Sequence, residues 1–223
     1  MLSIAASIRR PRTIPGLMLW LDARSIAKEG PLDSWASLAG GITATAPSKF
    51  NRPTVTLGTR PGVLFDGEYA CLTLPTMTPG ASWKAFVVGT RAGGSTYGTI
   101  IQLLSSSNTQ AAMVASNNDA TQGPVLVSSG STHIKGGSLA TGTSRILTLG
   151  PSTLKQNNVT ASTTSTTSPF TASGTLSMIG AANSAAPIRF FDGVINELRL
   201  YSSLTAGQEA AVYAELAEKW GVA

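Results

Sequence analysis

The sequence predicts an all-β protein: a two-sheet antiparallel jelly-roll sandwich with one short C-terminal helix. Short apolar runs recur at regular intervals between turn residues, which is typical of sandwiches and jelly rolls. The composition agrees, because 23 Gly, 12 Pro and only 12% charged residues favour strands and turns over helices. With 223 residues, 42% of them hydrophobic, the chain is long enough to bury one large core.

The first strong signal is the apolar run GLMLWLDA at residues 16–23, which predicts a fully buried strand. Asp22 at its end has two interpretations, a turn residue that bonds its own backbone or a ligand, and the turn is favoured. Residues 24–62 predict a long irregular excursion, held against the core by Trp35 and Phe50.

Further strands follow at short spacing, each bounded by Gly, Pro, Asn or Ser. We expect one strand to end at Asp66. The others are expected to span 69–74, 83–90, 99–104, 111–115, 125–128, 144–149 and 174–180. The Ser-, Thr- and Asn-rich stretch 153–171 is either a polar edge strand with a hairpin or a flexible loop.

The closing stretch, residues 188–221, predicts a strand, a turn and a capped helix. Strict alternation over 194–201 places Val194, Asn196, Leu198 and Leu200 on one face and Ile195, Glu197, Arg199 and Tyr201 on the other. A capping box, Thr205 with Gln208, starts the helix. The apolar stripe of the helix is Val212, Leu216 and Trp220, with Tyr213 beside them. Gly221 is its C-cap. We expect the helix over a sheet edge or across one end of the sandwich.

We expect residues 1–15 to form an arm and residues 16–223 a single domain. The net charge is +5, and the one basic cluster, Arg9, Arg10 and Arg12, lies in the arm. It either docks on an acidic neighbour or is a solvated tail. Because no basic stripe with interleaved aromatic residues is present, nucleic-acid binding is not predicted.

Targeting and redox features are sparse. Cys71 is the only cysteine, so no intrachain disulfide can form, and we expect a buried, inert thiol. The apolar segment 2–6 is too short for a signal peptide, and no apolar run approaches the length of a membrane span. We therefore expect synthesis in a cytoplasm without a secretion signal.

The residues that usually carry catalysis give no active site, and the chain is predicted not to be an enzyme. The single histidine, His133, lies in a polar, Gly-flanked segment that indicates an exposed loop. The strand around Glu197 lacks the spaced carboxylates that a retaining glycosidase needs. Arg199 lies on the same face two residues later, which indicates a structural ion pair or a backbone bond. No catalytic, cofactor or metal residue is predicted.

Three segments resemble the concanavalin A-like, laminin G-like jelly-roll domains found in tailed-phage virion proteins and bacterial surface proteins. They are residues 15–23 (PGLMLWLDA), 61–67 (PGVLFDG), and 191–221, with FDGVINE followed by Tyr201, Leu204, Glu209 and KWG. The resemblance implies two sheets packed face to face and, in many members, carbohydrate binding. The middle third departs from it, because it lacks the aromatic platform of a strong sugar site.

The same resemblance implies calcium at a sandwich rim in many members, with hard oxygen ligands. The candidate ligands are Asp22, Asp66, Asp119 and Asp192. These aspartates are not clustered in the sequence, so calcium remains the minority interpretation.

Our first hypothesis is a non-enzymatic bacteriophage virion structural protein, a capsid decoration or tail-associated module. It would be oligomeric in the assembly and bound to other virion proteins through the arm (Arg9, Arg10 and Arg12) and a sheet edge. The alternative is an adhesin that recognises a host surface glycan through loops 91–98 and 116–123. For that alternative Tyr97 is the first candidate to stack on a sugar, and its structural interpretation is a tyrosine packed on a neighbour.

Overall fold

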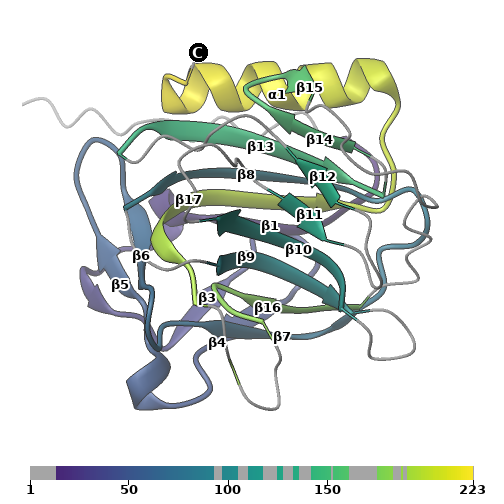
Figure 1. The fold of residues 1–223 in the computed structure, drawn as a ribbon. Helices are drawn as coiled ribbons and strands as arrows, with labels where there is room; N and C mark the ends of the chain where they lie inside the picture. The colour runs from purple at the N-terminus through teal and green to yellow at the C-terminus, as the bar shows by residue number, and fades with distance from the viewer. Residues whose placement is uncertain are drawn as a thin grey trace, which may run out of the picture.

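The structure is a computed structural model that describes residues 14–92, 97–104, 110–117, 125–127, 133–135, 142–151, 153–160, 175–182, 187 and 190–222. Two antiparallel sheets face each other, and one helix lies on the outside of the first (Figure 1). This confirms the predicted all-β sandwich with a C-terminal helix. Among the described residues, no helix combines the length and apolarity needed to span a membrane.

Sheet A has nine strands within the described residues, and its spatial order is β15-β14-β13-β8-β17-β6-β5-β2 with β1 added beside β17. Its strands are β1 (Leu17–Asp22), β2 (Gly30–Pro31), β5 (Thr54–Thr56), β6 (Gly62–Asp66), β8 (Lys84–Arg91), β13 (Ser144–Gly150), β14 (Thr153–Gln156), β15 (Val159–Thr160) and β17 (Asp192–Tyr201).

Sheet B has eight strands within the described residues, in the order β12-β11-β10-β9-β16-β7-β4-β3. They are β3 (Ser34–Ala36), β4 (Thr43–Thr45), β7 (Leu72–Met77), β9 (Tyr97–Leu104), β10 (Gln110–Asn117), β11 (Val125–Val127), β12 (His133–Lys135) and β16 (Thr175–Ile179). The helical elements are η1 (Ala23–Ser25), η2 (Lys49–Asn51) and α1 (Ala206–Trp220).

Strand β17 lies at the centre of sheet A. Strand β8 pairs along one edge of it, while β6 and β1 share the other edge end to end. A bulge between Ile195 and Glu197 changes the predicted alternation, because an extra residue shifts the side-chain faces by one position. Ile195 therefore joins Leu198 and Leu200 in the core between the sheets, and Glu197 points to the opposite face with Arg199.

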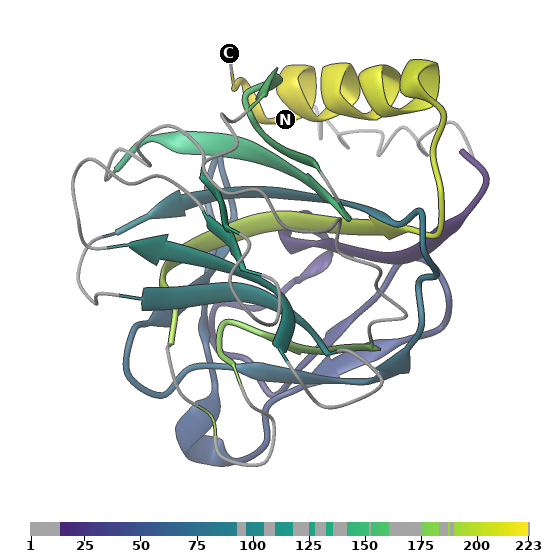
Figure 2. The same ribbon diagram turned by 45° about the vertical axis from the view of Figure 1, so that its right-hand side comes forward.

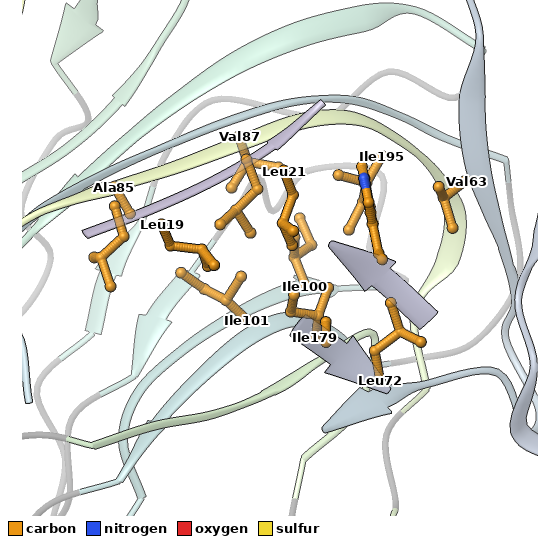
Figure 3. Packing of buried hydrophobic residues seen from close by; sticks show 14 of the residues in the cluster. Leu19, Leu21, Val63, Leu72, Ala85, Val87, Ile100, Ile101, Ile179 and Ile195 are labelled. Atoms are coloured by element: carbon orange, nitrogen blue, oxygen red, sulfur yellow. The ribbon is translucent and has the colours of Figure 1, made fainter. Parts of the chain in front are cut away.

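The main core fills the space between the two sheets. Figure 3 shows aliphatic side chains of β1, β8 and β17 meeting those of β7, β9 and β16. The labelled residues are Leu19, Leu21, Val63, Leu72, Ala85, Val87, Ile100, Ile101, Ile179 and Ile195. The burial predicted for the 16–23 run is confirmed for residues 19–23, whereas Leu17 and Met18 are half-buried and Gly16 is exposed.

Helix α1 lies across the outer face of sheet A, which corrects the predicted position at an edge or an end (Figure 2). The reason lies in β8, whose run is apolar on both faces. Phe86 and Val88 point outward and, with Ile146 and Tyr201, form a second core under Val212, Leu216 and Trp220. The predicted capping box and the αL C-cap at Gly221 are both present.

The 24–62 segment is more regular than predicted. It contributes four short strands, β2 to β5, which extend both sheets, and Trp35 is buried as expected. Phe50 is 75% exposed, so its expected packing role was wrong. The polar stretch after Gly150 begins with the β14–β15 hairpin, turned by Asn157 and Asn158 at positive φ, at the edge of sheet A. For 153–160 the edge-strand interpretation is therefore confirmed.

Gly180 gives a test of this packing. Its φ is +82°, and an added Cβ would come within 2.2 Å of the Phe65 ring. We expect Gly180→Ala to lower the free energy of unfolding by about 2–4 kcal/mol, measured by urea denaturation. The matched control, Gly207→Ala, adds its methyl into open space in the first turn of α1 and should raise stability by up to about 1 kcal/mol. Equal effects of the two substitutions would contradict this packing.

Candidate functional site

Two of the three segments that carry the family resemblance meet at one buried carboxylate, Glu197 of β17. Its Oε1 accepts hydrogen bonds from Trp20 Nε1 at 2.7 Å and Arg199 Nε at 2.6 Å. Its Oε2 accepts from Lys219 Nζ and Trp220 Nε1, both at 2.6 Å. Strands β1 and β17 and helix α1 are therefore joined through a single side chain.

The charges around Glu197 keep it ionised. Burial of the fully enclosed side chain raises its pKa, but Arg199 and Lys219 lower it more, and the net shift is downward. A carboxyl group whose pKa is lowered, and which is closed off from solvent, is not suited to donate a proton to a substrate. The predicted structural ion pair between Glu197 and Arg199 is confirmed.

Asp22 belongs to the same network. Its Oδ1 accepts the backbone N–H of Arg24 and caps η1, which confirms the turn interpretation. Its Oδ2 also binds Lys219 Nζ at 2.6 Å, an ion pair that the sequence did not predict. The sequence held one signal for this ion pair. Lys219 lies in the last turn of the capped helix, one residue before Trp220, and that turn faces β1.

The surface that remains open to a ligand lies at one end of the sandwich, where β6, β8 and β16 end and β9, β13 and β17 begin. We call this end the rim; β6 marks it on the left of Figure 1. The two Phe-Asp-Gly motifs meet here across the β6–β17 ladder, with Asp66 opposite Asp192 and the rings of Phe65 and Phe191 6.3 Å apart.

Asp66 fixes the turn that leaves the rim. Its Oδ1 accepts the backbone N–H groups of Glu68, Tyr69 and Ala70 at 2.8–2.9 Å. Partial burial raises the pKa of this carboxyl, but the three backbone donors lower it more, so Asp66 stays charged. The turn is therefore held rigidly, and the side chain of Tyr69 projects from a fixed position.

Aromatic side chains gather beside this turn. Tyr69 is 60% exposed, and its ring lies 6.3 Å from that of Phe190. The exposed Phe50 stands on η2, next to Asn51, whose side-chain amide donates to the Tyr69 carbonyl. The backbone N–H of Cys71 donates to the Asn51 carbonyl, so two hydrogen bonds join η2 to the segment 69–71. An exposed aromatic ring on a rigid support can stack on the apolar face of a sugar.

A small pocket opens at the same rim, between the sheets. Two of its lining side chains are basic, Arg91 of β8 and Arg145 of β13. Its remaining lining residues are mainly apolar: Val87, Gly89, Thr90, Ile100, Leu147, Phe191, Val194 and Ile195.

The predicted site residues have different outcomes. Tyr97 begins β9 at the rim, opposite Asn117, and so lies in a strand instead of a loop; only its backbone is described. His133 begins β12 and pairs with Val127, so it too was wrongly placed in a loop. Outside the described residues lie Arg9, Arg10, Arg12, Asp119 and most of the loops proposed for glycan contact.

The calcium candidates within the described residues, Asp22, Asp66 and Asp192, are not gathered at one point. Within that part of the chain, no three His, Cys, Asp or Glu side chains are close enough to hold a metal ion. Cys71 is buried as predicted, and burial together with the Asp66 charge raises its pKa to about 11. A thiol with so high a pKa is protonated and unreactive at neutral pH.

Sequence reasoning missed four rim residues. Tyr69 was placed inside a strand, Phe50 in the core and Arg145 in the strand 144–149, while Arg91 was only the first residue of the loop 91–98. One signal was available for the tyrosine, because the Asp-Gly at 66–67 predicts a turn and Tyr69 follows two residues later. The arginines became a pair only through the register of β8 and β13.

No protein-family model and no curated protein sequence matches the chain. Among solved structures, Trypanosoma rangeli sialidase in complex with sialic acid matches with a TM-score of 0.64 and 11% identity over 92% of this chain. The chain spans only 33% of that sialidase. Domain 4 of AbnA, a GH43 extracellular arabinanase from Geobacillus stearothermophilus, in complex with arabinotriose, matches at a TM-score of 0.62 and 16% identity. That match covers 89% of this chain and 98% of the domain.

These likenesses establish the fold, a lectin-type β-sandwich of the jelly-roll kind. They also correct two predictions. The virion structural role is wrong, because the sialidase and the arabinanase domain that the chain resembles come from carbohydrate-active proteins. The prediction that the chain is not an enzyme is contradicted too, because the sialidase and the arabinanase are enzymes. At 10–16% identity, their activities remain statements about those proteins.

Glu197 gives a test of the buried network. We expect Glu197→Gln to lower the free energy of unfolding at pH 7 by about 3–5 kcal/mol, because it leaves Arg199 and Lys219 without their shared buried carboxylate. Its folded pKa lies below the usual 4.5, so its contribution is complete above about that pH and is lost as the pH falls through the folded pKa. Urea midpoints between pH 3 and 7 should therefore fall more steeply for the wild type than for the variant.

The control for this test is Asp33→Asn. Asp33 is exposed and pairs with Arg52 at 3.4 Å, so its loss should change stability by no more than about 1 kcal/mol. If Glu197→Gln were as mild as the control, the network would not be what joins β1, β17 and α1.

Proposed function

We propose that this chain is a carbohydrate-binding domain that binds a glycan at the rim of its sandwich. The observation that carries the proposal is the display of exposed aromatic side chains, Tyr69 and Phe50, on a turn and a short helix that are locked by hydrogen bonds. Aromatic residues bury large area when they stack on a ligand, and rigid support lowers the entropy cost of ordering them.

The rest of the molecule is consistent with binding at this place. The outer face of sheet A is covered by α1, and the space between the sheets is filled by the main core. The buried carboxylates Asp22 and Glu197 are committed to Lys219 and are unavailable to a ligand. The rim combines open aromatic surface with polar groups, which is the usual composition of a sugar site.

The arabinanase domain supports the proposal. That structure holds arabinotriose, and the likeness spans nearly the whole of that domain, so the unit compared is a complete sandwich and not a fragment. We further infer that the chain is a laminin G-like member of these sandwiches, on the motifs around Trp20, Glu197 and Trp220 that meet in the buried network.

Glycan binding by the rim can be tested by alanine substitution. We expect wild-type protein to bind at least one neutral oligosaccharide in a glycan array that includes arabinotriose, with the affinity then measured by isothermal titration calorimetry. Tyr69→Ala and Phe50→Ala should each weaken binding by about tenfold or more, because each removes a stacking surface. Both side chains are exposed, so the fold should be unchanged.

Val159→Ala is the matched control, because Val159 is 71% exposed on β15, at the edge strand of sheet A. Its affinity should equal that of the wild type. If no oligosaccharide binds, carbohydrate binding is wrong; if binding survives both aromatic substitutions, the site lies elsewhere on the molecule.

A further inference from the structure

The two exposed aromatic side chains at the rim form an open surface and not a pocket. Phe50 is 75% exposed and Tyr69 is 60% exposed, so most of each ring faces solvent. A ring that lines a pocket for one sugar is largely covered, because such pockets surround most of their ligand. The exposure of both rings therefore favours a ligand that lies across them and continues beyond them.

The two rings stand on separate supports at a fixed spacing. Phe50 belongs to η2, where its backbone N–H donates to the capping Ser48 Oγ at 3.2 Å. Tyr69 belongs to the turn that Asp66 holds. The side-chain amide of Asn51 joins these supports by donating to the Tyr69 carbonyl at 2.8 Å. Since one side chain bridges the two backbones, the Cα atoms of Phe50 and Tyr69 are on the order of 10 Å apart. One sugar ring is too short to cover both.

Each ring is also held by a neighbouring side chain. Phe190 packs against Tyr69, with the ring centroids 6.3 Å apart and the planes inclined at 51°. Lys49 Nζ lies 5.1 Å from the centre of the Phe50 ring, which is a cation–π distance. Rings that are already ordered lose less entropy when a ligand stacks on them. A ligand long enough to cover both rings therefore gains two contacts at a low cost in order.

The charges beside the rings do not favour an acidic ligand. Among the described residues here, the cations are Lys49 and Arg52, and Arg52 pairs with Asp33 at 3.4 Å. Glu68 is exposed next to Tyr69, and the carboxylate of Asp66 accepts three backbone N–H groups of the turn. Two cations face three carboxylates, so this described surface has no positive excess to attract an acidic polymer. Charge complementarity therefore favours an uncharged sugar chain.

We propose that the rim binds a linear, uncharged polysaccharide along its length, with one sugar residue stacked on Phe50 and another on Tyr69. The inference rests on the proposed function and specifies its ligand as an internal stretch of a glycan chain and not a terminal sugar. The apolar C–H face of each sugar stacks on a ring. The exposed side chains of Lys49 and Glu68 are placed to hydrogen-bond with the hydroxyl groups that project from the sugars.

A chain-length series on the full chain tests this ligand. The probes are α-1,5-arabino-oligosaccharides and β-1,4-gluco-oligosaccharides of one to six units, with the same series of any neutral sugar that the array identifies, measured by calorimetry. In at least one series, affinity should rise about tenfold or more from one unit to three, because the second ring is then engaged, and should level off afterwards. The methyl glycoside of the trisaccharide should bind as the trisaccharide does, since the chain end is not bound.

Substitution of the rings tests whether two stacking positions are used. Tyr69→Ala and Phe50→Ala should each lower the affinity for the trisaccharide about tenfold but that for the single sugar by no more than about twofold, because one ring remains. Tyr69→Phe keeps the ring and should keep the wild-type length profile. Val159→Ala on β15 is the control and should change nothing. Unchanged urea midpoints check that all variants are folded.

An acidic series tests the charge argument. Oligogalacturonates of the same lengths should bind more weakly than the neutral chains, since Glu68 and Asp33 repel them and Lys49 is the one cation at the rings without a paired carboxylate among the described residues. Stronger binding of oligogalacturonates, weakened by added salt, would overturn the uncharged ligand.

The outcome can be read separately from that of the proposed function. A single sugar that binds as tightly as the trisaccharide, and that Tyr69→Ala or Phe50→Ala weakens, upholds carbohydrate binding at the rim and overturns the linear ligand. A length dependence that survives both alanine substitutions also overturns it, because the chain then lies elsewhere. Absence of binding in every series and in the array overturns the proposed function, and this inference with it.

Discussion

The buried carboxylate of Glu197 is the interaction on which the architecture depends. A charge inside a protein is stable only when it is paired and its hydrogen bonds are satisfied, and here two cations and two indole N–H groups do both. Because Trp20, Arg199 and Lys219 come from β1, β17 and α1, satisfying one side chain fixes the first strand, the central strand and the last helix relative to one another. Asp22 and Glu215 extend the network as the second partners of Lys219 and Arg199.

This arrangement explains why sheet A is buried on both faces. The bulge after Ile195 lets β17 place aliphatic residues toward sheet B and, from Glu197 on, its charged pair toward α1. Strand β8 is also apolar on both faces, with Val87 toward sheet B and Phe86 toward α1. A helix held by ion pairs at Lys219 and by apolar contacts at Val212 and Leu216 closes the outer face, so that face offers little surface to a ligand.

The proposed glycan site therefore lies at the rim, where the strands end. The rim has a rigid base, since Asp66 locks the turn and the two Phe-Asp-Gly motifs pair with each other. Exposed Tyr69 and Phe50 stand on this base, outside the space between the sheets.

The sequence by itself determined the elements with strong local signals. Apolar runs and turn residues set most long strands, and Thr205, Gln208 and Gly221 set the ends of the helix, because caps and periodicity act over a few residues. Only the tertiary structure decided which residues meet across long separations. It paired Asp22 with Lys219, brought Arg91 beside Arg145 and left Phe50 exposed, because register, the bulge at 195–197 and sheet stacking depend on the whole chain. The rim, and with it the candidate site, is a product of that packing.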